Sequence, residues 1–139
     1  MTINQLLLGT LLLLLTACGS DTTVKDQKAL LEGRWNLTEG QRNGKVTDSL
    51  RDTYFEFTAD DKMSTNLPIK GGMNSPYDIV DNAIVQTIIN DIQIKYNIVE
   101  LTPQNLTLTA NLRGFDFVFS MEKEGTEGLS MLENGESFQ

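Results

Sequence analysis

Gly33-Arg34-Trp35-Asn36-Leu37-Thr38 is the stretch of this sequence that decides the fold. Apolar and polar residues alternate along it, so Trp35 and Leu37 fall on one side of an extended chain and the polar residues fall on the other. A period of two is typical of a β-strand with one buried face. We therefore predict a strand at residues 33–38 that places Trp35 in the core.

Seven later segments also have strand-like apolar patterns and are separated by short polar turns. They comprise residues 53–58, 62–67, 77–80, 83–89, 92–101, 106–112 and 115–122. Within 92–101 the apolar phase moves by one residue after Ile98, which predicts a β-bulge at that point. Before the first strand, residues 26–32 predict a short helix, for which Thr23 or Asp26 is a suitable cap.

Together these patterns predict an all-β fold, an antiparallel up-and-down β-barrel of about eight strands with a short N-terminal helix. Strands joined mostly by tight turns form a meander, and closing the meander into a barrel removes its unpaired edges. The chain of 139 residues is long enough for one such domain with one hydrophobic core.

Two stretches carry a family resemblance. The G-x-W strand within residues 31–38, preceded by a short helix, resembles the opening strand of the lipocalin-like domains of bacterial lipoproteins, and residues 96–108 resemble a later part of the same domains. The likeness covers residues 30–123. In that family the tryptophan plugs the closed end of an up-and-down barrel, so the resemblance implies this role for Trp35. The alternative is that Trp35 fills the core of another kind of small sheet.

The sequence departs from typical lipocalins at two positions. Thr102-Pro103-Gln104-Asn105 stands where they have a T-D-Y-like turn, and Lys123 stands where they have an arginine that packs across the tryptophan. Both positions lie outside the G-x-W strand.

The inward-facing stripes of the predicted strands are rich in aromatic and aliphatic side chains. In an eight-stranded barrel such side chains either fill the centre or leave space for one small ligand. Two hypotheses about function follow. In the first, the barrel binds a small apolar or amphipathic ligand through Phe57, Tyr96, Leu108 and Phe117. In the second, the core is filled and the outer surface or the loops bind an envelope protein.

Two polar segments are candidates for the rim of the barrel. Residues 40–52 occupy the place where lipocalin-like barrels have a lid over the open end, and residues 68–76 form a second candidate. Alternatively, Asn43-Gly44 forms a tight primed turn and extends the first strand into a hairpin.

Charge and residue inventory argue against several classes of function. A net charge of -8 repels nucleic acid, because phosphates carry the same sign. Histidine is absent and Cys18 is the only cysteine, which removes the Ser-His triad, an intramolecular disulfide and the usual zinc ligands. Carboxylate pairs such as Asp60-Asp61 match no calcium loop. We therefore expect no catalytic residue, no metal and no cofactor.

The N-terminal segment has the pattern of a lipoprotein signal peptide. Residues 6–15 form an apolar run of about ten residues, whereas a membrane-spanning helix needs about twenty. Leu15-Thr16-Ala17-Cys18 then matches a lipobox, in which the chain is cut before a lipidated cysteine. A transmembrane helix and ordinary secretion with a free cysteine are the alternatives. We predict that residues 1–17 are removed and that Cys18 receives a diacylglycerol.

These assignments divide the chain into four parts. They are a signal peptide at 1–17, a lipidated tether at 18–25, the barrel at 26–123 and a C-terminal tail at 124–139 that is rich in Gly, Glu and Ser. A lipid on Cys18 makes the membrane a partner and places the protein in the bacterial cell envelope. Gly19 stands where some inner-membrane lipoproteins carry an aspartate, which favours the outer membrane.

Overall fold

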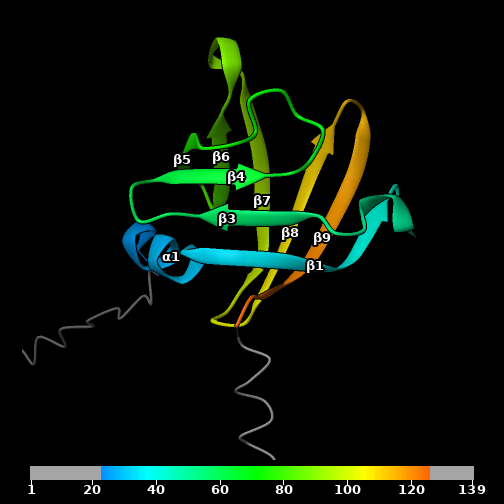
Figure 1. Ribbon diagram of the computed structural model, residues 1–139, viewed down its shortest axis with the longest axis horizontal. Helices are drawn as coiled ribbons and strands as arrows, with labels where there is room; N and C mark the ends of the chain where they lie inside the picture. The colour runs from blue at the N-terminus through cyan, green and yellow to red at the C-terminus, as the bar shows by residue number, and fades with distance from the viewer. Residues whose placement is uncertain (1–22, 126–139) are drawn as a thin grey trace, which may run out of the picture.

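The computed structural model describes residues 23–125, so the predictions for Cys18, the signal peptide and the C-terminal tail beyond Gly125 lie outside the described residues. Within this range the chain forms one antiparallel sheet that closes on itself (Figure 1). The strands are β1 (Gly33–Arg42), β2 (Lys45–Val46), β3 (Tyr54–Phe57), β4 (Lys62–Thr65), β5 (Ser75–Val80), β6 (Ala83–Thr87), β7 (Gln93–Leu101), β8 (Asn105–Leu112) and β9 (Phe115–Lys123).

Strand pairing confirms the predicted up-and-down barrel. Each strand from β3 to β8 pairs with the next strand along the chain, and β1 pairs with both β3 and β9, which closes the ring. The two-residue strand β2 lies outside this ring and pairs with the end of β1, at Gln41 and Arg42. The barrel therefore has the eight strands that the apolar pattern predicts, each at the predicted place in the chain.

A short helix, α1 (Val24–Leu31), covers one end of the barrel (Figure 1). It begins two residues before the predicted start because Thr23 caps it and Asp26 bonds back to Thr23 in a capping box. On the barrel side, the Gln27 amide donates to Asn82 Oδ1 at 2.8 Å in the turn between β5 and β6. We call this the closed end of the barrel.

Trp35 lies inside the closed end and has no exposed surface. Its indole N–H donates to the carbonyl oxygen of Leu31 at 2.8 Å, which ties the first strand to the end of α1. The ammonium of Lys123 lies 5.2 Å from the centre of the Trp35 ring and donates to the carbonyl oxygen of Leu30 at 3.1 Å. Lys123 thus lies across the tryptophan, as the arginine does in typical lipocalins.

The middle of the barrel is filled by aromatic side chains and one polar network. Phe55 meets Tyr96 and Phe119 edge to face, with ring centroids 5.3 and 5.4 Å apart. The Tyr96 hydroxyl donates to Gln86 Oε1 at 3.0 Å, and the Gln86 amide donates to Ser75 Oγ at 2.6 Å. Because Gln86 is completely buried, these bonds satisfy its side chain in place of water.

Two bulges bend the sheet, of which one was predicted. The pairing of β7 with β8 shifts between Ile98 and Glu100, which confirms the predicted bulge and leaves Val99 64% exposed. A second bulge separates Leu37 from Glu39 in β1. After it, β1 continues along β9 as far as Arg42, four residues beyond the predicted end of the strand.

The segment 40–52 is not a single lid loop. Asn43 and Gly44 have φ angles of 50° and 77°, which is the backbone of a primed turn, and they join β1 to β2 as the alternative interpretation predicted. A short 3-10 helix, η1 (Asp48–Leu50), follows and buries Leu50. The hairpin interpretation is therefore confirmed, and the lid over the open end stays a prediction, with Arg42 and Leu50 of this segment lining a pocket there.

The other end of the barrel is built from a second set of connections, and we call it the open end. It carries the loop between β4 and β5, the β8–β9 turn at Arg113 and Gly114, and a 3-10 helix, η2 (Ile89–Asp91), at the tip of the β6–β7 hairpin. This hairpin projects at the top of Figure 1. No helix in the described part of the chain is long and apolar enough to cross a membrane.

Candidate ligand-binding site

The wall of the barrel is incomplete between β7 and β8 at the open end. The ladder between these strands runs from Leu101 and Leu106 as far as Asn97 and Thr109, where it stops. Residues 93–96 of β7 still pair with β6, and residues 110–112 of β8 still pair with β9. Each strand therefore keeps its outer neighbour while the two strands separate from each other.

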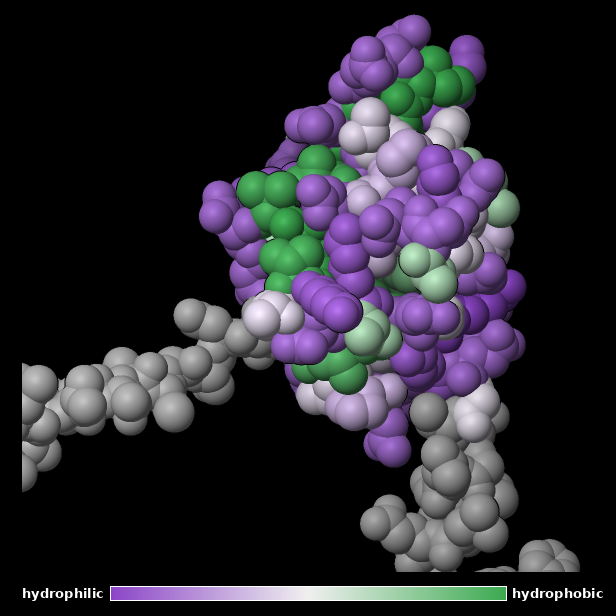
Figure 2. All heavy atoms as spheres, turned by 90° about the vertical axis from the view of Figure 1, so that its left-hand side faces the viewer, coloured by the Kyte–Doolittle hydropathy of each residue, from purple (hydrophilic) through white to green (hydrophobic). Residues whose placement is uncertain are grey.

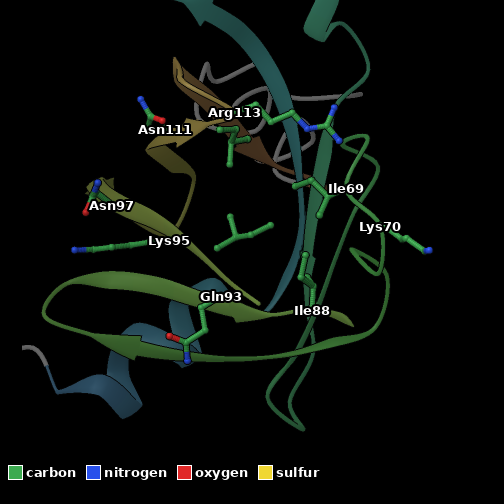
Figure 3. A pocket seen from close by; sticks show the side chains of 10 residues that line it. Ile69, Lys70, Ile88, Gln93, Lys95, Asn97, Asn111 and Arg113 are labelled. Carbon is green, nitrogen blue, oxygen red and sulfur yellow. The ribbon is translucent and has the colours of Figure 1, made fainter. Parts of the chain in front are cut away.

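A pocket of about 590 Å³, which we call the slot pocket, occupies this gap (Figure 3). Its lining residues are Ile69, Lys70, Ile88, Gln93, Ile94, Lys95, Asn97, Asn111, Leu112 and Arg113. Neighbouring positions on one strand, such as Ile94 and Lys95 of β7, point to opposite faces of a sheet. Since both kinds of position line the slot pocket, it passes through the wall instead of lying on one face of it.

The slot pocket combines an apolar floor with polar and cationic edges. Ile94 and Leu112 come from inward-facing positions, whereas Lys95, Asn97 and Asn111 come from outward-facing ones and lie together on one side of the opening (Figure 3). The lining contains no Asp or Glu. This arrangement can hold an apolar group inside and a hydrogen-bond acceptor or anion at the surface.

Three cationic side chains line the slot pocket, namely Lys70, Lys95 and Arg113. The ion pairs found within residues 23–125 use Lys28, Arg34 and Arg51 and none of these three. In Figure 3, Arg113 extends from the β8–β9 turn across the open end toward the loop that carries Ile69, whereas Lys70 points away from the pocket.

A smaller cavity of about 220 Å³, which we call the rim pocket, adjoins the slot pocket. It is lined by Arg42, Leu50, Leu67, Pro68, Ile69, Leu112, Arg113, Phe115 and Phe117. Ile69, Leu112 and Arg113 line both pockets and form the partition between them. The Arg42 guanidinium stacks 3.9 Å from the centre of the Phe115 ring, so two residues of the rim pocket lining hold each other in place.

The loop between β4 and β5 packs closely against η2, and this contact shapes the slot pocket. Gly71 has a φ of 85°, and a Cβ built there would lie 2.9 Å from Ile89 Cγ1. Glycine therefore meets both the backbone conformation and the close approach at this position. From the same loop, the carbonyl oxygen of Gly72 accepts a hydrogen bond from the buried Gln86 amide at 3.3 Å.

The four residues predicted to bind a ligand do not share a pocket. Phe57, Tyr96 and Leu108 belong to the packed core, and none of them has more than 1% of its surface exposed. Phe117 is half-buried, stacks on Phe119 with centroids 5.9 Å apart, and lines the rim pocket. Of the four, Phe117 alone lines either of the two pockets described here.

The candidate rim at residues 68–76 does contribute Ile69 and Lys70 to the slot pocket, but sequence reasoning missed the pocket residues on β7 and β8. Lys95, Asn97 and Asn111 occupy the outward phase of clean strand patterns, so they look like ordinary solvent-facing positions. For Arg113 the sequence predicts only a turn with Gly114 between the last two strands, and the structure confirms the turn, with a φ of 53° at Arg113.

Several ionisable groups outside the slot pocket and the rim pocket have structural partners. Burial raises the pKa of the Tyr96 hydroxyl above its ordinary value, and burial together with the charges of nearby carboxylates raises the pKa of Tyr77 to about 12. Lys28 forms ion pairs of 3.2 Å with both Asp61 and Asp78 at the closed end. A hydrogen bond from the Ile79 N–H, followed by the Lys28 contact, lowers the pKa of Asp78.

Within residues 23–125, no cluster of three or more Cys, Asp or Glu side chains is arranged to hold a metal ion. Every buried side-chain nitrogen or oxygen in this range has a hydrogen-bond partner.

The comparison with protein families agrees with this geometry. The lipocalin-like domain family matches residues 31–108, which is more than half of the chain. The chain belongs to the lipocalin-like domain family. The match runs from the end of α1 to the middle of β8, so it covers most of the lipocalin-like barrel and β7 in full. No curated protein and no solved structure matches the chain.

Proposed function

We infer that this lipocalin-like protein is a membrane-anchored binding protein for a small apolar or amphipathic molecule, which it holds at the open end of the barrel. The observation that carries this function is the slot pocket, where the wall opens between β7 and β8. Ligand pockets in proteins have volumes of about 300 to 1,000 Å³ and combine apolar walls with a few polar groups. The slot pocket meets both criteria.

The position of the pocket agrees with a filled barrel centre. Phe55, Tyr96 and Gln86 close the middle of the barrel, so a ligand has room above them and not along the whole axis. The rim pocket adds an apolar extension beside the slot pocket, and both share Leu112. A ligand of this class would therefore lie across the open end, partly through the wall.

The proposed anchor is the lipid on Cys18, which would hold the protein on the outer membrane of the bacterial envelope. Five residues separate Cys18 from Val24, the first residue of α1. Because α1 lies at the closed end, a lipid at Cys18 would attach there and leave the open end away from the point of attachment. The anchor would then not obstruct the slot pocket.

A second candidate function is an envelope protein-interaction module. It is favoured by the tip of the β6–β7 hairpin, where Ile89 and Ile92 are 46% and 54% exposed. Figure 2 shows an apolar group at this projecting tip, surrounded by hydrophilic residues. Two isoleucines at a tip make a small patch, whereas stable protein interfaces bury about 800 Å² on each partner, so ligand binding remains the better-supported function.

Mass spectrometry of the protein purified from its native membrane tests both parts of this proposal. We expect an acylated N-terminal peptide that begins at Cys18 and, under native conditions, a small molecule that leaves the protein on unfolding. As the matched control, Cys18→Ala should remain an unprocessed, unlipidated precursor. Normal acyl labelling of Cys18→Ala would contradict the anchor, and native protein that neither carries nor takes up any amphipathic molecule would contradict the binding function.

A further inference from the structure

We propose that the gap between β7 and β8 is a strand-insertion site, which takes an extended polypeptide segment in which acidic and apolar residues alternate. The inserted segment would pair with both strands and complete the wall of the barrel at the open end. This proposal goes beyond the small-molecule function, because it rests on the backbone at the two edges of the gap and not on the volume of the slot pocket.

The backbone of β7 has unpaired groups along its edge of the gap. The N–H of Ile98 donates to the carbonyl oxygen of Asn82 at 3.1 Å, so the backbone groups of Ile98 point to the β6 side. Successive residues of a strand point these groups to alternate sides, and β7 pairs with β6 without a shift in register, so Gln93 and Lys95 point theirs toward β8. The ladder to β8 stops before it reaches these two residues, which therefore have no strand partner on that side within residues 23–125.

The facing edge of β8 is unpaired in the same way. The N–H of Lys123 donates to the carbonyl oxygen of Gln104 at 3.0 Å, and the ladder between β8 and β9 continues in one register from Asn105 to Leu112. Every second residue counted from Gln104 therefore points its backbone groups to β9, and Asn111 points its own toward the gap. Two strand edges thus present main-chain donors and acceptors to the gap, and such groups bind an extended peptide by strand addition.

The outer side of the gap favours acidic side chains in the inserted segment. The protein carries a net charge of -8, yet the lining of the slot pocket contains no Asp or Glu. Lys95, on the β7 edge, takes part in none of the ion pairs found within residues 23–125. On the β8 edge, the Asn111 amide already donates to Asp116 at 2.7 Å. An acidic side chain would therefore lie beside Lys95, which repels a cationic strand.

The inner side of the gap favours apolar side chains at alternate positions of the same segment. Ile94 and Leu112 line the slot pocket from inward-facing positions, and Ile69 and Ile88 lie across the opening from Lys95 (Figure 3). Because successive side chains of a strand point to opposite faces, one residue of the segment would face the isoleucines and the next would face Lys95. This geometry gives the alternation of acidic and apolar residues.

The test begins with isothermal titration calorimetry on the full chain in lipid nanodiscs. The probes are three capped octapeptides: glutamate alternating with valine, the same peptide methylated on the backbone nitrogens of its valines, and lysine alternating with valine. We expect the first to bind about tenfold or more tightly than the others, since methylation removes the donors to one edge at constant charge and lysine opposes Lys95. Equal binding of either control, or no binding of any peptide, would overturn the proposal and leave the small-molecule function untouched.

Amide hydrogen exchange then locates the bound peptide. The amides of Lys95 and Asn111 should exchange rapidly in the free protein and about tenfold more slowly with the glutamate peptide bound. The amide of Ile98, which is paired with Asn82, should be slow in both states. Slow exchange at Lys95 and Asn111 in the free protein would show that the edges are already occupied by another part of the chain, and it would overturn the proposal, as would exchange that the peptide does not change.

Two matched variants separate the site from the overall charge of the protein. Lys95→Gln should weaken binding of the glutamate peptide about threefold, because an exposed ion pair contributes little more than this. Lys25→Gln removes the same charge from α1 at the closed end and should leave the affinity unchanged. Equal weakening in the two variants would show that the peptide responds to net charge alone and would overturn the site.

Discussion

The closed end and the open end of this barrel differ in how tightly their side chains are packed, although the same strands form both. At the closed end, α1, Trp35 and Lys123 interlock through hydrogen bonds and a cation–π contact, and Trp35 has no exposed surface. At the open end, β7 and β8 separate beside a pocket whose lining includes cationic side chains without ion-pair partners among residues 23–125. The difference indicates that stability is concentrated at one end, which leaves the other end available for binding.

The largest expected effect is at the closed end. Trp35→Ala should lower the free energy of unfolding by about 3–5 kcal/mol, because it leaves a cavity and removes the donor to the Leu31 carbonyl. Urea denaturation followed by circular dichroism measures this loss. A change near zero would place the tryptophan outside the core and would contradict the assignment of this end as the closed one.

One strand allows the two ends to be compared by the same substitution. Leu106, at the start of β8, is completely buried, whereas Leu112, at its end, is partly buried beside both pockets. Leu106→Ala should cost about 2–5 kcal/mol, and Leu112→Ala should cost about 1 kcal/mol, because its side chain already adjoins empty space. Equal losses in denaturation experiments would show that the two ends are packed alike.

Between the two ends, the buried network of Tyr96 and Gln86 should make the protein sensitive to alkali. The unfolded chain releases a tyrosine proton near pH 10, whereas burial raises the pKa of Tyr96 in the folded protein, so stability is lost as the pH rises above about 10. Tyr96→Phe should cost about 1–3 kcal/mol at pH 7, because Gln86 Oε1 loses its donor, and should reduce the alkaline loss.

Tyr77 should account for the alkaline loss that remains in Tyr96→Phe, since its pKa of about 12 is also above the value of the unfolded chain. Denaturation midpoints measured from pH 7 to pH 11 provide the comparison. An identical pH profile for wild type and Tyr96→Phe would show that the Tyr96 hydroxyl is not buried.

The smallest expected effect concerns the side chain that lies across the plug. Lys123→Met should cost about 0.5–1 kcal/mol, since it removes the cation over the Trp35 ring and the donor to the Leu30 carbonyl while keeping much of the aliphatic chain. Lys123→Arg should restore most of the loss, because arginine offers the same charge. If Met and Arg behave alike in denaturation experiments, the contact contributes through packing alone.

The sequence predicted the closed end far better than the open end. The alternation of apolar and polar residues around Trp35 and in β8 indicates which face of each strand is buried. The closed end is built from such buried side chains, so the sequence predicts it well. Alternation does not report where two neighbouring strands stop pairing, so Lys95 and Asn111 have the pattern of an ordinary outer face. The aromatic residues Phe57 and Tyr96 were predicted to line a cavity for the same reason, since an inward position does not reveal whether the interior is filled.

Local features of the backbone can be predicted from the sequence, whereas features that depend on the pairing of distant strands cannot. Asn43-Gly44 was recognisable as a primed turn because its residues suit positive φ angles. The bulge after Leu37, in contrast, depends on the register of β1 against β9, which are some eighty residues apart in the chain. Local patterns carry no information about pairing over such a separation.

The most direct test of this account is an NMR titration of the isotope-labelled full chain in nanodiscs with decanoate. The single tryptophan supplies one indole N–H resonance that reports on the closed end alone. We predict that the backbone amides of Lys95, Asn111 and Arg113 shift with added decanoate while the Trp35 indole resonance stays in place. A shift of the indole resonance with no change at these three amides would contradict the account.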